Sequence, residues 1–241
     1  MKSLDLFKVN GYVEGHISTF HQKRLDKIKE LKLNEVLKKK NPYLFKAKNI
    51  LTAQDLIKSI LDAYLSSQEE TLFGEFIEGL AIFVCNEVYG AKKSLLVGID
   101  MEFEKDEIYY IVEIKAGWNW GNASQIKQLR QNFVNAKTLL GLESNKTVVA
   151  VNGCCFGKDK RPNKGDYLKL CGQIFWEFIS GNENLYTQII EPIGYRAKEK
   201  NQEFLESYSA VINQFTLEFS QTFCDKGVII WEKLVEFNSG K

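Results

Sequence analysis

Residues 94–100 read SLLVGID and residues 108–115 read IYYIVEIK, and these two apolar runs decide the fold. Each run is rich in aliphatic, β-branched or aromatic side chains, and the segment between them alternates before it enters a charged turn. The pair is therefore predicted to form a β-hairpin. Because side chains alternate along a strand, Glu113 and Lys115 share one face, and in a twisted hairpin Asp100 comes beside that face.

Two carboxylates and one ammonium group flanked by apolar strands favour a cation site. Burying Asp100 and Glu113 costs free energy unless the charges pair with one another or bind a cation. Carboxylate oxygens suit Mg²⁺, which usually completes its shell with water and phosphate oxygens. The arrangement predicts metal-assisted cleavage of a phosphodiester bond. The alternative is a cross-strand ion pair at a sheet edge, worth a fraction of a kcal/mol, and the spacing alone leaves it open.

The elements around the hairpin predict an α/β fold with a central mixed β-sheet flanked by helices. A helix is expected from Asn122 or Ala123 to about Leu140, followed by a third strand over 146–152. A right-handed crossover sets this strand parallel to the second strand of the hairpin. Downstream, the pattern predicts helices over 166–179 and 197–223 and a short buried strand over 227–231.

Upstream of the hairpin the pattern is helical. The helical stretch of the first forty-odd residues is expected to end near Pro42, because a proline disfavours helix in the residue before it. Thr52 is a plausible N-cap of the next helix, and Ser66 or Ser67 is expected to cap a longer helix through Val88. In that last helix two acids three residues apart, Glu75 and Glu78, share a face that either points to water or joins the site. Glu78 is the better candidate, because a glycine follows it and permits close approach.

The bulk composition indicates a single compact domain spanning 1–241, with a helical extension over 1–50, a catalytic core over 68–155 and a mainly helical part over 166–241. The chain is 44% hydrophobic and contains only three prolines. Its five cysteines, an odd number without a C-x-x-C pattern, indicate reduced thiols in a cytoplasmic protein. No apolar run is long enough to span a membrane, so no membrane partner is expected.

The positive charge lies in blocks, although the formal net charge is only +1. Between Lys23 and Lys48 there are ten Lys or Arg residues and three acids. A loop after the third strand carries four more cations, and the segment 118–122 leaves the second strand directly. Such blocks either build a footprint for phosphates or are merely solvated faces. The candidates for contact with DNA are Asn119, Asn122, Lys158, Lys160, Arg161 and Lys164, which reach either base edges or only phosphates.

At Ile99-Asp100 and Glu113-Ile114-Lys115 the chain resembles the PD-(D/E)xK nuclease superfamily, with Ile99 in place of the proline. The segments 73–78, 118–125 and 169–181 are similar to a family of type II restriction endonucleases that cut the interrupted palindrome GGNCC. The resemblance covers most of the chain from about residue 40 onward. It implies a restriction-endonuclease-like core with N- and C-terminal helical additions.

The resemblance also implies roles for the residues. Asp100, Glu113 and the carbonyl of Ile114 would hold Mg²⁺, and Lys115 would orient the attacking water and stabilise negative charge. Glu78 would supply an extra carboxylate. Gln125 could hydrogen-bond a phosphate or the water, or be an ordinary exposed helix residue.

The expected partners are double-stranded DNA, a second copy of the chain to match a palindrome, and a cognate cytosine methyltransferase. The apolar side chains of 197–223 would serve either that homodimer or the protein's own core. Two other functions stay open: a structure-specific repair or recombination nuclease, and a non-catalytic DNA-binding protein.

Overall fold

The computed structural model describes residues 2–143 and 146–241. The described chain forms two compact units. One unit takes residues up to Ile17 together with Phe73–Tyr195, and the other takes Ser18–Leu72 together with Arg196–Lys241. The prediction of one domain with helical additions stays a prediction.

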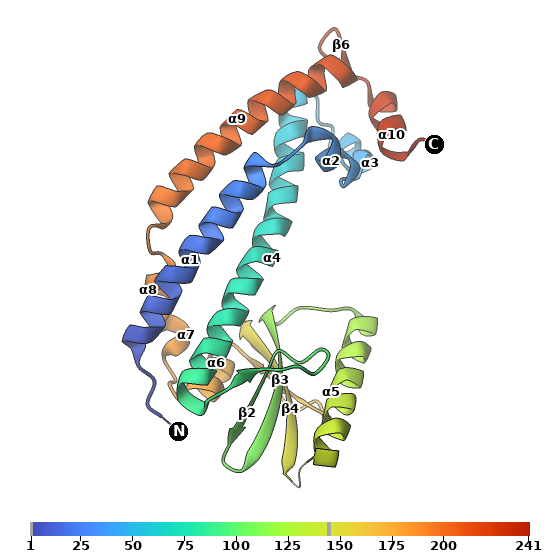
Figure 1. Cartoon of the computed structure of the whole chain (residues 1–241). Helices are drawn as coiled ribbons and strands as arrows, with labels where there is room; N and C mark the ends of the chain where they lie inside the picture. Colours follow the sequence, from blue (N-terminus) through green and yellow to red (C-terminus); the bar gives the residue numbers. More distant parts are fainter. Residues whose placement is uncertain (1, 144–145) are drawn as a thin grey trace. The chain divides into compact units, whose positions relative to one another are not determined.

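The first unit is built on a five-stranded sheet in the order β1-β2-β3-β4-β5 (Figure 1). Strand β2 runs antiparallel to both of its neighbours, β1 and β3, and β3, β4 and β5 run parallel to one another. The predicted mixed sheet and the parallel pairing of the second and third predicted strands are therefore confirmed. The strands are β1 (Lys92–Lys93), β2 (Met101–Lys105), β3 (Ile108–Gly117), β4 (Thr147–Phe156) and β5 (Leu168–Cys171).

The predicted hairpin is present, but the prediction that residues 94–100 form its first strand is wrong. Residues 94–100 form a turn and loop, in which Leu95 is 99% exposed and Val97 is 85% exposed. Gly98 adopts a φ of +73°, and the Ile99 amide donates to the carbonyl of Leu96 at 3.1 Å. Because the apolar run forms this turn, it does not pair with β3. The strand that pairs with β3 is β2, the alternating segment that follows the run.

The tight end of the hairpin is set by Asp106 and Glu107. Both have positive φ, +51° and +63°, as a two-residue type I′ turn requires. Such a turn matches the right-handed twist of the strands on either side. With the register set here, Met101 pairs with Val112, and Asp100 comes level with Glu113.

Helices cover both faces of the sheet. Helix α5 (Ala123–Glu143) packs its Leu129 and Phe133 against Ile111 of β3. Helix α6 (Gln173–Ser180) places Phe178 against Tyr110, which points to the opposite face. The expected position of α5 is confirmed, whereas the helix expected over 166–179 is half wrong. Its first part forms β5, which pairs with the free edge of β4.

Helix α4 (Ala53–Tyr89) is one unbroken helix of 37 residues that contributes to both units. The predicted cap at Thr52 is confirmed, because its Oγ1 accepts from the amide of Asp55 at 3.1 Å. The predicted cap at Ser66 or Ser67 is wrong. Ser67 donates to the carbonyl of Ala63 at 3.3 Å, so its hydroxyl bonds back into the preceding turn and does not start a new helix.

The second unit is helical, with a two-stranded sheet at its end. Its core holds Phe215, Phe219 and Phe223 of α9. The predicted helix over 197–223 is confirmed. The buried strand expected over 227–231 is partly wrong, because only Val228–Ile229 form a strand, Val228 is 68% exposed, and Trp231 begins a helix. This short strand pairs with Cys224–Asp225. The elements not yet delimited are α1 (Leu6–Lys29), α2 (Leu33–Lys38), α3 (Pro42–Ala47), α7 (Leu185–Gln188), α8 (Ile190–Ile193), α9 (Ala197–Phe223), β6 (Cys224–Asp225), β7 (Val228–Ile229) and α10 (Trp231–Ser239).

Among the described residues, the helices include none whose length and apolar character would let it cross a membrane.

Candidate active site

Asp100 is held at the start of β2 by hydrogen bonds on both sides. Its amide donates to the carbonyl of Val112 at 2.9 Å, and its own carbonyl accepts from the amide of Ser94 at 3.1 Å. Its carboxylate Oδ2 accepts from the amide of Ile114 at 2.6 Å. The side chain is therefore locked against β3, the strand that carries the other two candidate groups.

Glu113 and Lys115 share one face of β3, as the alternation predicted. The Lys115 Nζ lies 2.6 Å from Glu113 Oε1. The Glu113 side chain is only 11% exposed and that of Lys115 is 32% exposed. The ammonium group also lies 5.1 Å from the centroid of the Trp120 ring, within the range of a cation–π interaction.

The second oxygen of the Glu113 carboxylate, Oε2, is buried and has no hydrogen-bond partner in the described part of the chain. A buried carboxylate oxygen without a partner is costly, and a bound cation would satisfy it. The donor set fits a hard metal ion with few protein ligands, because Asp100 lies opposite Glu113 across the β2–β3 pairing. Over residues 2–143 and 146–241, no group of three or more His, Cys, Asp or Glu side chains is arranged to hold a metal ion.

Burial is the main influence on the two carboxylates. Burial raises the pKa of Glu113, the hydrogen bond and charge of Lys115 oppose that rise, and Asp100 adds to it. Burial likewise raises the pKa of Asp100, against the Ile114 hydrogen bond and the charges of Lys115 and Lys93. A divalent cation would offset the desolvation of both carboxylates.

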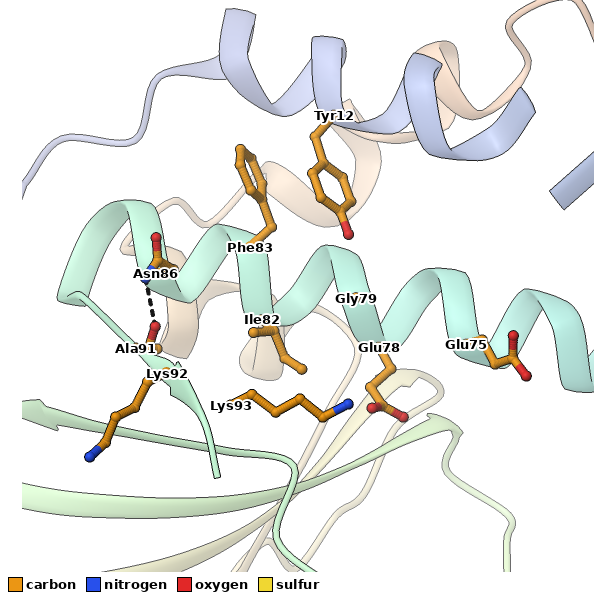
Figure 2. Close-up of a pocket in the computed structure, with 10 residues that line it drawn as sticks. All are labelled: Tyr12, Glu75, Glu78, Gly79, Ile82, Phe83, Asn86, Ala91, Lys92 and Lys93. Atoms are coloured by element: carbon orange, nitrogen blue, oxygen red, sulfur yellow. Dashed lines mark hydrogen bonds between the residues drawn. The ribbon is translucent and has the colours of Figure 1, made fainter. Parts of the chain in front are cut away.

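Glu78 of α4 faces the same group of charges. Burial and then the Asp100 carboxylate raise its pKa, while Lys93 and Lys115 lower it. Glu78 lines a cavity of about 600 Å³ together with Glu75 and Gly79 (Figure 2). The structure thus brings Glu78 into electrostatic contact with the site, and its part in catalysis stays a prediction.

Gln125 and Asn122 lie at the start of α5, where they cap the helix. The Asn122 side chain accepts from the amides of Ser124 and Gln125, both at 3.1 Å, and Gln125 Oε1 accepts from the Asn122 amide at 2.9 Å. This is the reciprocal geometry of a capping box. Gln125 also lines a second cavity, of about 400 Å³, with Glu113 and Lys115. Neither predicted role is tested by this geometry, but both amide oxygens already serve the helix.

Asn152 supports the site from the neighbouring strand β4, and it was not predicted from the sequence. It is fully buried on β4, and its side chain donates to the carbonyl of Glu113 at 3.3 Å. Its Oδ1 accepts from the Trp120 indole at 3.0 Å. Trp120 therefore connects Asn152 to Lys115. A polar residue inside the apolar run of β4 was the signal that could have revealed it.

The basic loop follows β4 at the same edge of the sheet, because Phe156 pairs with Gly117 at the end of β3. Lys158, Lys160 and Arg161 are exposed. Lys164 instead pairs with Asp159, with Nζ 2.9 Å from Oδ2. The exposed cations are therefore placed to meet a substrate, whereas Lys164 holds the loop together.

Asn119 is exposed just after β3, as a base-contacting residue must be. Two aromatic side chains lie in the same predicted DNA-contacting segments, although neither was itself a candidate for contact with DNA. Trp118 is 46% exposed and Phe156 is 63% exposed, at the ends of neighbouring parallel strands. Their position directly after predicted strands was the signal available in the sequence.

Comparison with known proteins adds one finding to this geometry. The family model described as type II restriction endonuclease EcoO109I matches residues 7–201, which include every candidate site residue. A search of curated proteins finds no match for the chain.

Proposed function

The chain belongs to the family of type II restriction endonuclease EcoO109I and is a nuclease, and on that premise we propose that it cuts double-stranded DNA at a short palindrome by Mg²⁺-dependent hydrolysis. The observation that carries this proposal is the buried, unpartnered Oε2 of Glu113 beside Asp100. An oxygen in that state is prepared for a cation, and the cation would in turn meet a DNA phosphate.

Asp100, Glu113 and the carbonyl of Ile114 are the groups that would hold the ion. A bound Mg²⁺ would polarise the phosphoryl oxygen and lower the pKa of a water molecule. The amide of Ile114 holds the Asp100 carboxylate in one orientation, and Lys115 occupies the other oxygen of Glu113. The protein's share of the chemistry is therefore to keep two carboxylates desolvated and oriented before the substrate arrives.

Lys115 is the group placed to stabilise charge on the reacting phosphate. Its ammonium is tethered by Glu113 and packed against Trp120, so it is positioned before DNA binds. Negative charge develops on the phosphoryl oxygens in the transition state, and a preorganised cation lowers that barrier. Glu78 and Gln125 complete the proposed catalytic set, Glu78 through its carboxylate near Asp100 and Gln125 through its amide nitrogen.

Recognition of the DNA sequence is assigned to the sheet edge around the site. We propose a GGNCC-like target, with Asn119, Asn122 and the loop cations Lys158, Lys160, Arg161 and Lys164 as the contacting residues. Arginine or lysine meets guanine and asparagine meets adenine in the major groove, and the same side chains can contact phosphates. The three exposed cations of the loop support this assignment most directly.

A palindromic target calls for two active sites, so the working enzyme is proposed to be a homodimer in the cytoplasm, paired with a cytosine methyltransferase that protects the host's own sites. On α9, most aromatic side chains fill the core of their own unit, while Leu205 and Leu217 are exposed. Sedimentation equilibrium with and without DNA tests the dimer. A monomer under both conditions, cutting the two strands in independent steps, would rule it out.

The function itself is tested by incubating the protein with unmethylated plasmid and phage DNA in Mg²⁺, with EDTA and Asp100→Asn as controls. Discrete fragments that map to one palindrome support the proposal. Cuts that follow branches or mismatches would instead make the protein a structure-specific nuclease. A gel shift without any cleavage would contradict nuclease activity.

A further inference from the structure

Lys93 lies next to the candidate active site and has no place in the catalytic set described so far. It is the second residue of β1, and its Cα pairs with that of Met101, the residue after Asp100. The amide of the next residue, Ser94, bonds the carbonyl of Asp100 itself. Strand β1 therefore anchors Lys93 to the segment that carries the first catalytic carboxylate.

The side chain of Lys93 points toward the acidic side of the site. Neighbouring residues on a strand point to opposite faces. Lys92 reaches Glu102, with Nζ 3.6 Å from Oε1. Figure 2 shows the Lys93 side chain extending toward the Glu78 carboxylate, while the ammonium of Lys92 points away from it. The charge of Lys93 acts on both Glu78 and Asp100, although burial dominates the electrostatics of the two acids.

Within the part of the chain that the structure describes, the Lys93 ammonium has no ion pair within 4.0 Å and no side-chain hydrogen bond, and the residue is exposed. By contrast, Lys92 and Lys115 each pair with a glutamate. A cation that lies near two carboxylates without bonding either, and that borders a cavity of about 600 Å³, is available to an incoming anion. For a nuclease, the anion that enters such a site is a DNA phosphate.

We propose that Lys93 donates a hydrogen bond to the phosphate that is cut, as a second cation beside Lys115. The sheet order supports this position. Asp100 precedes β2, and β2 lies between β1 and β3, so Lys93 and Lys115 belong to the two strands on either side of the Asp100 segment. In the strand register Lys93 shares the sheet face of Met101 and Val112, opposite to that of Glu113 and Lys115, and the charges of both lysines act on Asp100. The negative charge that grows on the phosphoryl oxygens is then shared by two ammonium groups. This inference rests on the proposed nuclease function and deepens it.

The test compares Lys93→Met with Lys92→Met, two charge removals that keep a long side chain on adjacent residues. One measurement is the rate of single-turnover cleavage with the full-length protein in excess over a DNA duplex that contains the site, in Mg²⁺. The other is the affinity for the same duplex in EDTA at several salt concentrations. Lys93→Met is expected to slow cleavage at saturation by about 10- to 10³-fold. It should also reduce the salt slope by about one unit for each active site. Lys92→Met should leave both readouts near those of the wild type.

Three results would overturn the proposal. Lys93→Met could match Lys92→Met in both readouts. A smaller salt slope with an unchanged rate would place Lys93 on a phosphate that is not cut. A slower rate with an unchanged salt slope would mean that Lys93 acts through the carboxylates and not on the DNA. If the wild type cut no DNA, the proposed function would fail, while the salt slope would still report whether Lys93 meets a phosphate. Urea unfolding of Lys93→Met and of a second variant, Lys93→Gln, checks that the fold is retained.

Discussion

Two carboxylate–lysine pairs stand at the same edge of the sheet, and they differ in how completely they are satisfied. In the proposed catalytic pair, Glu113 and Lys115 on β3, one carboxylate oxygen is buried without a partner among the described residues. In the loop pair, Asp159 accepts from both the Lys164 ammonium and the Arg161 amide. Burial raises the pKa of Glu113. Burial also acts to raise the pKa of Asp159, but the hydrogen bonds of Lys164 and the Arg161 amide, together with the lysine charges, outweigh it and lower that pKa.

The difference separates a site prepared for a reaction from a contact that supports a loop. Both oxygens of Asp159 have partners, so the loop pair supports the loop, and Lys164 is less free than the other loop cations to contact DNA. An incomplete set costs stability in the free protein, and that cost is recovered when a cation or substrate supplies the missing partner. Perturbed carboxylates of this kind cluster at functional sites in general.

The largest effect is expected from removing the charge of either catalytic carboxylate. Asp100→Asn and Glu113→Gln should each lower the rate of cleavage in Mg²⁺ by at least about 10³-fold, because each loses a ligand for the ion. DNA binding in EDTA should be retained or become tighter, since repulsion of phosphate decreases. Glu102→Gln is the matched control, because Glu102 is also a buried glutamate on this sheet but lies outside the site. Cleavage near the wild-type rate would remove the substituted residue from the site.

Substitution of Lys115 should cause the second-largest loss of cleavage rate. Lys115→Ala is expected to lower the single-turnover rate by about 10²- to 10³-fold, because its ammonium stabilises charge that appears in the transition state. Lys115→Arg should restore little, since the planar guanidinium cannot take the place of a compact ammonium beside Glu113. Lys164→Ala serves as the comparison, and its rate should stay within a few-fold of the wild type. Full activity in Lys115→Arg would mean that charge alone matters at this position.

The pH dependence of stability should differ in sign between the two carboxylates. The raised pKa of Glu113 means that its contribution to stability is present below the ordinary value of 4.5 and is lost as pH rises through the folded pKa. The lowered pKa of Asp159 means that its contribution is present above 3.8 and is lost as pH falls.

Chemical unfolding in EDTA from about pH 3 to about pH 7 measures this contrast. Glu113→Gln should gain free energy of unfolding relative to the wild type as pH rises. Asp159→Asn should lose up to about 1 kcal/mol at neutral pH and little in acid. Parallel curves for the two variants would show that the two pairs do not differ as the structure indicates.

The smallest effects are expected in the loop. Replacing Lys158, Lys160 or Arg161 with alanine should each weaken DNA binding and reduce the salt slope by about one unit if the cation meets a phosphate. If one of them reads guanine, its loss should instead relax discrimination at one position by about 1–3 kcal/mol. Lys164→Ala should change affinity less than the other three, because Lys164 is engaged by Asp159. No effect from any of the four would place the DNA surface elsewhere.

The sequence predicted which residues come together at the site better than it predicted the elements that carry them. The alternation of β3 put Glu113 and Lys115 on one face, and the structure confirms that arrangement. The apolar run before Asp100 was taken for a strand, yet a turn at Gly98 makes it a loop. The candidate site survived this error because Asp100 is tied to β3 whether the residues before it form a strand or a turn.

Local periodicity also gave wrong predictions for segments whose secondary structure depends on contacts with distant parts of the chain. Residues 168–171 became a strand because β4 offered them an open edge, and the serines in the middle of α4 gave a capping pattern that the helix did not use. Helix and strand propensities are weak priors that tertiary context overrides. Lys93 is a sharper case, since a lysine in a two-residue strand has no periodicity to interpret.

The sequence by itself determined the α/β class, the hairpin that presents Asp100 to Glu113 and Lys115, and the family resemblance confirmed over residues 7–201. These properties depend on local periodicity and on residue types close together along the chain. Only the tertiary structure decided that Asn152 supports Glu113, that Glu78 faces Asp100, and that Lys93 approaches from the strand on the other side. Each of these relations joins residues that are distant along the chain or depends on strand register and burial, and such distances are set only when the sheet has paired and the helices have packed on it.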